Sequence, residues 1–444
     1  MEDGVSEDLV AALLTLPAID VVAWSSSTSL RGAGKRRASQ TLGASHVLDG
    51  AVQRVGDRIR ISVSLIDARA QTVLWGRAYD GGIDDLLTLE NHIARDMTDV
   101  LKLAVADTNL QVDVDPVAYR LFLGARDQLN RVPPRAHEAV GMLTAAVERS
   151  PRFSRGWSML SAAYVATQGP IDESAYTPVA RANARDAAHR ALALNPRNAQ
   201  AYAALAATSD RPGAWARIET LLTSGLRYEP SNIDALYGAG AFYADVGWNH
   251  RSVSLLRRAQ SLDPLTPQST FLLLRVLEAD GRDDEVEAML SRASRRWPGN
   301  RSLWRFSLRR AIWKDRLSEA RSIMGQAPPN SGEDAGYFAD LIACREDADS
   351  PRLDTFLAPV RGDPLPFTWP IVVFALAMLG ETAACVALVR RIYLSPTGRR
   401  QAPTWVLHQG MMGPVRADPG VQDTFRQLGL TAFWAAEGRQ RDDD

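Results

Sequence analysis

The chain has 444 residues, which is long enough for more than one folded unit. Its 51 basic and 52 acidic residues leave a formal net charge of −1, so the overall charge does not favour nucleic acid as a partner. Hydrophobic residues make up 46% of the chain, so disorder is not the default expectation.

The first predicted elements are short and alternate in type. Residues 6–14 and 35–42 have a helical pattern of apolar side chains, and a short strand over 19–23 lies between them. A third helix is predicted over 86–103.

A β-meander is predicted between the second and third of these helices. Residues 58–65 alternate strictly between polar and apolar side chains, as a strand with one buried face does. Gly56 and Asp57 form the turn from a preceding strand over 46–54, and a third strand covers 72–79. These elements together predict an α+β domain over residues 1–106.

Several short motifs occur in this domain, at residues 3–9, 25–27, 48–54, 56–61, 65–67 and 74–79. They resemble the TolB-like N-terminal domain that bacterial regulatory proteins carry before tetratricopeptide repeats. Members usually begin with an additional apolar strand, which would lie upstream of Met1. Either the true start lies upstream, or the chain is a fragment, or the sheet is rearranged. Relatives often carry a winged-helix or class III nucleotidyl cyclase output domain ahead of this region, and this sequence contains neither.

Prolines recur with a fixed period in the next part of the chain. Pro196, Pro230, Pro264 and Pro298 follow one another at intervals of 34 residues, and such a period indicates a repeat array. Small residues lie five positions before the prolines, at Ala191, Gly225, Ala259 and Ala293. Large residues lie six positions after three of them, at Tyr202, Leu236 and Trp304. Thr270 stands at the equivalent position after Pro264. Because it is too small and polar to anchor the repeat, we assign this anchoring role to its neighbour Phe271.

Each repeat is expected to be two antiparallel helices, with the proline at a unit boundary where its missing N–H costs nothing. In this respect residues 115–330 resemble the tetratricopeptide repeat (TPR) family, which implies an all-α solenoid. The longer interval from Pro151 to Pro196 is explained by a loop over 168–178. Residues 331–444 are predicted to form degenerate helical repeats and a C-terminal cap.

No pattern of catalytic or metal-binding residues stands out. No two histidines are spaced four residues apart on one helix, and the run Arg31–Arg36 lacks the first glycine and the hydroxyl residue of a phosphate loop. Cys344 and Cys385 form two buried thiols, one disulfide or a redox pair. We therefore expect no enzyme activity, no cofactor and no metal.

The resemblance to TPR proteins implies a partner groove lined by the first helices of successive repeats. The lining positions carried over by register are Arg155, Gln200, Asp234, Tyr237, Phe271, Arg275, Arg305 and Arg309. The last three arginines, beside Phe271, would suit an acidic segment or a chain-terminal carboxylate. The alternative is that these arginines are ordinary solvated helix faces.

The sequence predicts a non-enzymatic interaction or regulatory module that binds a protein or peptide partner. The alternative is the regulatory C-terminal part of a class III adenylate cyclase or a winged-helix transcriptional regulator. The apolar run at 371–379 is too short to span a bilayer, and the first twenty residues lack an export signal. The chain as written is therefore expected in the cytoplasm, or in the periplasm if a membrane anchor precedes it.

Overall fold

The computed structural model describes residues 21–22, 26–27, 30, 35–85, 88–90, 92–93, 96–97, 114–129, 135–167, 178–329, 331–362, 369–395, 403–436 and 438. The predicted helix 6–14 lies outside these residues, as do 168–177 of the predicted loop. Val21 and Val22, from the predicted strand 19–23, have no regular secondary structure.

The predicted meander is present as a three-stranded antiparallel sheet in the order β1-β2-β3. The strands are β1 (His46–Val55), β2 (Arg58–Asp67) and β3 (Val73–Gly82). Ile61 of β2 pairs with Val52 on one side and with Tyr79 on the other. Helix α3 (Lys35–Leu42) precedes the sheet at the predicted position.

The sheet shares an apolar cluster with the first helices of the solenoid. The alternating residues of β2 are buried against Leu89, Ile93 and Met97, which belong to the predicted helix 86–103 and are helical. The same cluster continues to Tyr119 and Phe122 of α5 (Pro116–Leu129). The alternation in β2 therefore marks the face of the sheet that packs on helices.

Helix pairs follow the sheet, after the short 3-10 turn η1 (Ile83–Asp85) and beginning with α5. The bounds of the others are α6 (Ala136–Arg149), α7 (Ser154–Ala166), α8 (Pro178–Leu194), α9 (Ala199–Ala207), α10 (Trp215–Tyr228), α11 (Ile233–Asp245), α12 (Asn249–Leu262), α13 (Pro267–Ala279), α14 (Asp283–Arg296), α15 (Arg301–Trp313) and α16 (Leu317–Met324).

The periodic prolines lie at the unit boundaries. Each stands two residues after the end of a second helix, as Pro230 does after Tyr228. Two residues further on is the N-cap of the next first helix: Asn198, Asn232, Thr266 and Asn300. The three asparagine side chains accept hydrogen bonds from backbone N–H groups of the first turn. The capping positions therefore carry the same 34-residue period as the prolines.

The turn inside each pair also follows the period. Gly213, Gly247 and Gly281 have φ angles of 73°, 76° and 70°, and Asp315 takes the same left-handed conformation with φ 59°. Glycine adopts this conformation without a steric penalty, which explains its recurrence.

The anchor assignment at the third repeat is wrong. Thr270 is 2% exposed and fills the anchoring position, whereas Phe271 is half-buried. The Thr270 hydroxyl accepts a hydrogen bond of 2.7 Å from Nε2 of Gln260, so a small polar residue is tolerated there. The small residues five positions before the prolines are buried as predicted, with Ala191 and Ala259 fully enclosed.

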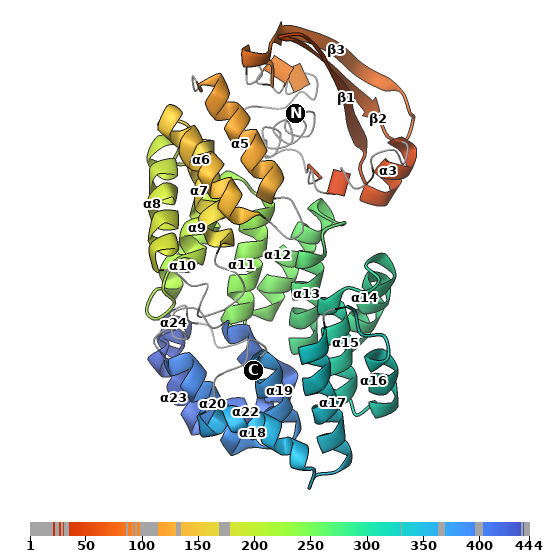
Figure 1. Cartoon of the computed structure of the whole chain (residues 1–444), viewed down its shortest axis with the longest axis vertical. Helices are drawn as coiled ribbons and strands as arrows, with labels where there is room; N and C mark the ends of the chain where they lie inside the picture. The colour runs from red at the N-terminus through yellow and green to blue at the C-terminus, as the bar shows by residue number, and fades with distance from the viewer. Residues whose placement is uncertain are drawn as a thin grey trace.

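The C-terminal helices curve back toward the middle of the solenoid (Figure 1). They are α17 (Gly332–Glu346), η2 (Pro351–Leu353), α18 (Asp354–Arg361), α19 (Trp369–Met378), α20 (Thr382–Leu394), η3 (Thr404–His408), η4 (Gly410–Met412), α22 (Gly413–Ala417), α23 (Pro419–Gln427) and α24 (Leu430–Ala436). Helix α24 contacts α10. Within the described ranges, no helix is both long and apolar enough to cross a membrane.

Candidate functional site

The first helices of successive pairs, α7, α9, α11 and α13, contact one another side by side. We call the surface that these helices and α15 present with the predicted groove residues the inner face. Every predicted groove residue lies on one of these helices. The repeat register thus places the predicted residues in one row.

The N-terminal half of the inner face is polar and partly open. Arg155 is half-buried, and its guanidinium carbon lies 5.4 Å from the centre of the Phe122 ring. The side chain of Ser158 donates to Oε1 of Gln200 at 3.1 Å, and Gln200 is hydrogen-bonded to Asp234, which is exposed. Hydrogen bonds therefore link α7, α9 and α11 through adjacent polar side chains.

The central part of the inner face carries the arginine Arg275 beside two aromatic residues. Tyr237 is hydrogen-bonded to Gln268 of α13, and Phe271 packs edge-to-face on Trp297 at 6.2 Å between ring centres. Burial, together with the positive charges of Arg309 and Arg305, lowers the pKa of Arg275 to about 10. Among the described residues, no ion pair to Arg275 is present.

The C-terminal part is covered, so two of the predicted arginines already have partners. Arg305 lies 3.6 Å from the buried Asp334 carboxylate at the start of α17, measured from Nε to Oδ2. Arg309 is buried and pairs with Glu278. Its guanidinium also lies 5.0 Å from the centre of the Phe374 ring on α19. Arg309 is therefore enclosed by the C-terminal helices and does not line an open groove.

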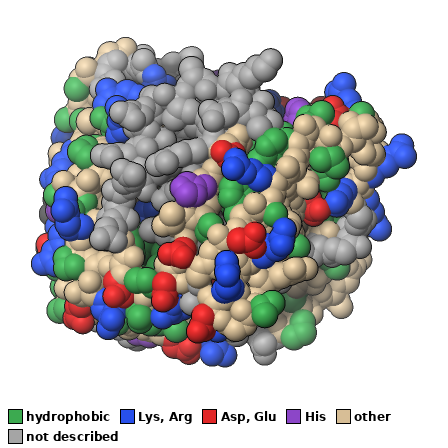
Figure 2. Space-filling model, turned by 90° about the horizontal axis from the view of Figure 1, so that it is seen from above, with side chains coloured by type: hydrophobic (Ala, Val, Ile, Leu, Met, Phe, Trp, Pro, Cys, Tyr) green, Lys and Arg blue, Asp and Glu red, His purple; other side chains and the backbone are tan. Residues whose placement is uncertain are grey.

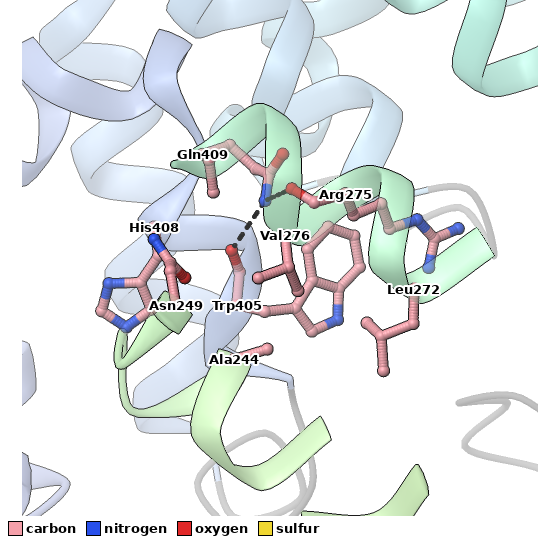
Figure 3. Close-up of a pocket in the computed structure, with 9 residues that line it drawn as sticks. Ala244, Asn249, Leu272, Arg275, Val276, Trp405, His408 and Gln409 are labelled. Carbon is pink, nitrogen blue, oxygen red and sulfur yellow. Dashed lines mark hydrogen bonds between the residues drawn. The ribbon is translucent and has the colours of Figure 1, made fainter. Parts of the chain in front are cut away.

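Residues Thr404–Gln409, which we call the latch segment, lie on the inner face beside α11 and α13 (Figure 3). Thr404 Oγ1 donates to the main-chain oxygen of Asp245 at 2.7 Å, and the Trp405 N–H donates to Oδ1 of the same residue at 3.1 Å. Trp405 stacks under the Arg275 guanidinium, 4.7 Å from ring centre to carbon. Sequence reasoning missed this segment because no periodic pattern links it to the repeats.

Metal-binding groups are not clustered in the described parts of the chain. No cluster of three or more His, Cys, Asp or Glu side chains there could hold a metal ion. Of the run Arg31–Arg36, residues 31–34 lie outside the described ranges, and Lys35 and Arg36 begin α3. On the face shown in Figure 2, described acidic and basic side chains are interspersed.

The two cysteines are buried, free thiols and form no disulfide. Burial raises the pKa of the Cys385 thiol to about 12, and burial also raises the pKa of Cys344. Of the three interpretations, two buried thiols is the one that this structure contains. The Cys385 thiol donates a hydrogen bond to the Val373 main-chain oxygen at 3.4 Å.

Comparison with known proteins finds one related curated sequence and several helical-repeat structures. No protein-family model matches the chain. The protein described as "Putative adenylate cyclase 3" of Rhizobium meliloti (strain 1021) is 31% identical over 169 residues, which cover 36% of this chain. The match spans 28% of that relative's length.

Similar solved structures include a thermophilic TPR protein of Thermus thermophilus, with 19% identity and a TM-score of 0.35, covering 42% of this chain and 94% of that one. PilF of Pseudomonas aeruginosa has 14% identity and a TM-score of 0.36, covering 55% and 97%. The human IFIT1 dimer with m7Gppp-AAAA has 12% identity and a TM-score of 0.45, covering 79% and 78%. The TolB-like assignment of residues 1–106 stays a prediction.

Proposed function

We propose that the chain is a non-enzymatic interaction module that binds a protein or peptide partner on the inner face. The observation that carries this proposal is the continuous row of polar side chains on α7, α9, α11 and α13, which ends at a guanidinium with no ion pair to any described residue. Polar side chains on successive rigid helices are suited to bind an extended chain at regular intervals. The same proposal divides the chain into an N-terminal domain (1–106), a repeat solenoid (115–330) and a C-terminal cap (331–444).

The chemistry of the row favours a partner with a carboxylate at the end that lies beside Arg275. Arg275 has positively charged neighbours and no described carboxylate in contact, so a bound carboxylate would relieve the repulsion and accept charge-assisted hydrogen bonds. Arg155 supplies a second positive charge at the other end of the row. Arg309 is not part of this site, since it is buried and paired with Glu278.

Affinity capture with the full tagged chain tests this function. We expect a specific partner whose capture falls about tenfold in Arg155→Glu and in Arg275→Glu, because each removes a charge-assisted contact and adds a repulsive charge. Arg292→Glu is the matched control, since Arg292 is exposed on the second helix α14. Capture that is unchanged in both inner-face variants, or reduced equally in the control, contradicts the proposal.

A second candidate function is favoured by the similarity to the rhizobial sequence. In this proposal the chain is the regulatory part of a class III adenylate cyclase or a winged-helix regulator. The test is the in-frame DNA sequence upstream of the codon for Met1. A cyclase or winged-helix domain encoded there supports the second candidate, and an in-frame stop codon immediately upstream of Met1 contradicts it.

A further inference from the structure

The latch segment has two chemically different sides. Val406 and Leu407 are fully buried and belong to the same apolar cluster as residues of α19 and α20. Thr404, Trp405 and the pair His408–Gln409 contact α11 and α13 through polar groups. The His408 ring also stacks on Phe425 of α23, and the Trp405 ring lies against Phe374 of α19. The apolar side of the segment therefore lies in a core that residues of α11 and α15 share with the C-terminal helices, and its polar side faces α11 and α13.

The polar side is recognised mainly by one residue at the end of α11. The main-chain oxygen of Asp245 accepts from Thr404 Oγ1 and from His408 Nε2, the latter at 3.0 Å. Because a carbonyl oxygen only accepts, Nε2 of His408 carries the proton. The Asp245 carboxylate accepts from the Trp405 N–H with one oxygen and pairs with Arg211 at 2.7 Å through the other.

Helix α13 completes the contact. Nε2 of Gln409 donates to the main-chain oxygen of Arg275 at 3.3 Å, and the Arg275 side chain covers the Trp405 ring (Figure 3). The side chains fill the space between the segment and the helices, which leaves no room for a water molecule. The latch segment thus occupies the position that a bound peptide would take beside Arg275.

This contact contains buried polar groups whose desolvation costs free energy. Oε1 of Gln409 is buried and has no hydrogen-bond partner in the described structure. Burial also raises the pKa of Asp245, which means that its charged form is unfavourable at this position. Buried polar groups with incomplete partners weaken an interface relative to well-packed apolar contacts.

We propose that the latch segment is an intramolecular ligand of the inner face, and that a partner reaches Arg275 by displacing the side chains of Thr404, Trp405 and Gln409. This inference rests on the proposed function of the inner face. The partner would place a carboxylate on Arg275 and an aromatic side chain where Trp405 lies. It would also carry a hydroxyl or amide donor for the main-chain oxygen of Asp245. Displacement leaves Val406 and Leu407 in the shared apolar core.

The direct test uses a fluorescent peptide with the sequence of residues 403–412 and the full chain. The Thr404→Val and Trp405→Ala double variant loses one hydrogen bond and the ring contact, so its own segment is released more often. We expect it to bind the peptide about tenfold more tightly than the wild type by fluorescence anisotropy. Adding Arg275→Ala should abolish the gain, and no gain in a folded double variant overturns the proposal.

Hydrogen exchange on the wild-type chain provides a second test that needs no variant. We expect the amide of Trp405, which donates to the Asp245 carboxylate, to exchange through a local opening, faster than the amides of α11. Exchange of this amide only together with α11 and α13 would identify the segment as permanent core and overturn the proposal. Neither test uses the unknown partner, so a failure here leaves partner capture through Arg155 untouched, and a failure of capture leaves these results unaffected.

Discussion

Backbone conformation at single residues explains the recurrence of glycine in the turns. Gly281 has a φ of 70°, and a Cβ atom added there would meet no atom within 4 Å. The only penalty for a side chain at this position is therefore the left-handed backbone itself. Asp315 adopts that backbone conformation at the equivalent turn in spite of the penalty.

We expect Gly281→Ala to lower the free energy of unfolding by about 1–2 kcal/mol, the cost of the left-handed conformation for an L-residue. Gly336→Ala is the matched control, because Gly336 lies within helix α17 and a Cβ there also has free space. The control should raise stability by about 0.5–1 kcal/mol. Urea unfolding of both variants checks the signs, and a loss of stability in both would refute the backbone explanation.

The buried Asp245 predicts a pH dependence of stability. Burial raises its pKa above the ordinary value of 3.8, and Arg211 and the Trp405 N–H oppose the rise. The folded state therefore holds the proton more tightly than the unfolded state. The contribution of Asp245 is most favourable below pH 3.8 and declines as the pH rises through the folded pKa.

Asp245→Asn removes this titration. We expect the stability of the variant relative to the wild type to increase as the pH rises from about 4 to about 7, measured by urea unfolding at each pH. A relative stability that falls over the same interval would mean that pairing with Arg211 outweighs burial.

The cysteines are predicted to be unreactive in the folded protein. With a pKa of about 12, Cys385 has a thiolate fraction of roughly 10⁻⁴ at about pH 8. We expect a thiol reagent such as DTNB to modify Cys385 only as the chain unfolds, with the denatured protein as the positive control. Rapid modification under native conditions would show that the Cys385 environment is open.

At the scale of the elements, the capping residues divide into two kinds. Asn232 accepts a hydrogen bond from the Ala235 N–H at 3.0 Å, whereas Thr266 makes no side-chain cap bond and is followed by Pro267. A proline at the first helical position removes one unsatisfied N–H group. The start of α11 is therefore capped by an asparagine side chain, whereas α13 starts with a proline and has no side-chain cap.

Asn232→Ala should destabilise the fold by about 1 kcal/mol, since it removes the partner of an N–H group in the first turn of α11. Thr266→Ala, at the equivalent position of the next repeat, should change stability by less than about 0.5 kcal/mol. Thermal or urea unfolding measures both, and equal effects would contradict this role of the Asn232 side chain.

At the scale of the whole molecule, the C-terminal helices close back onto the repeats. The indole N–H of Trp215 donates to the Leu428 main-chain oxygen at 2.7 Å, and that of Trp434 donates to the Val246 oxygen at 2.9 Å. The Phe433 ring lies 5.2 Å from the Trp248 ring. These contacts join α24 and the residues just before it to helices that lie far earlier in the chain.

Phe433→Ala should cost about 3–5 kcal/mol, because it leaves a cavity in this contact. The exposed neighbour Thr431 is the control, and Thr431→Ala should remain within about 0.5 kcal/mol of the wild type. Chemical unfolding monitored by tryptophan fluorescence compares the two. Similar small effects would show that the closure contributes little to stability.

The amino-acid sequence by itself determined the repeat period, the boundaries of the helix pairs, the three strands and the row of first-helix residues that contains Arg155 and Gln200. These features depend on proline, small residues and alternating side chains, whose effects act within a few residues and therefore leave a local pattern. Only the tertiary structure decided which part of the inner face is covered. Asp245 and Thr404 are 159 positions apart, and Arg309 is covered by Phe374 of α19, so no period records these contacts. They depend on how the C-terminal helices curve back in space.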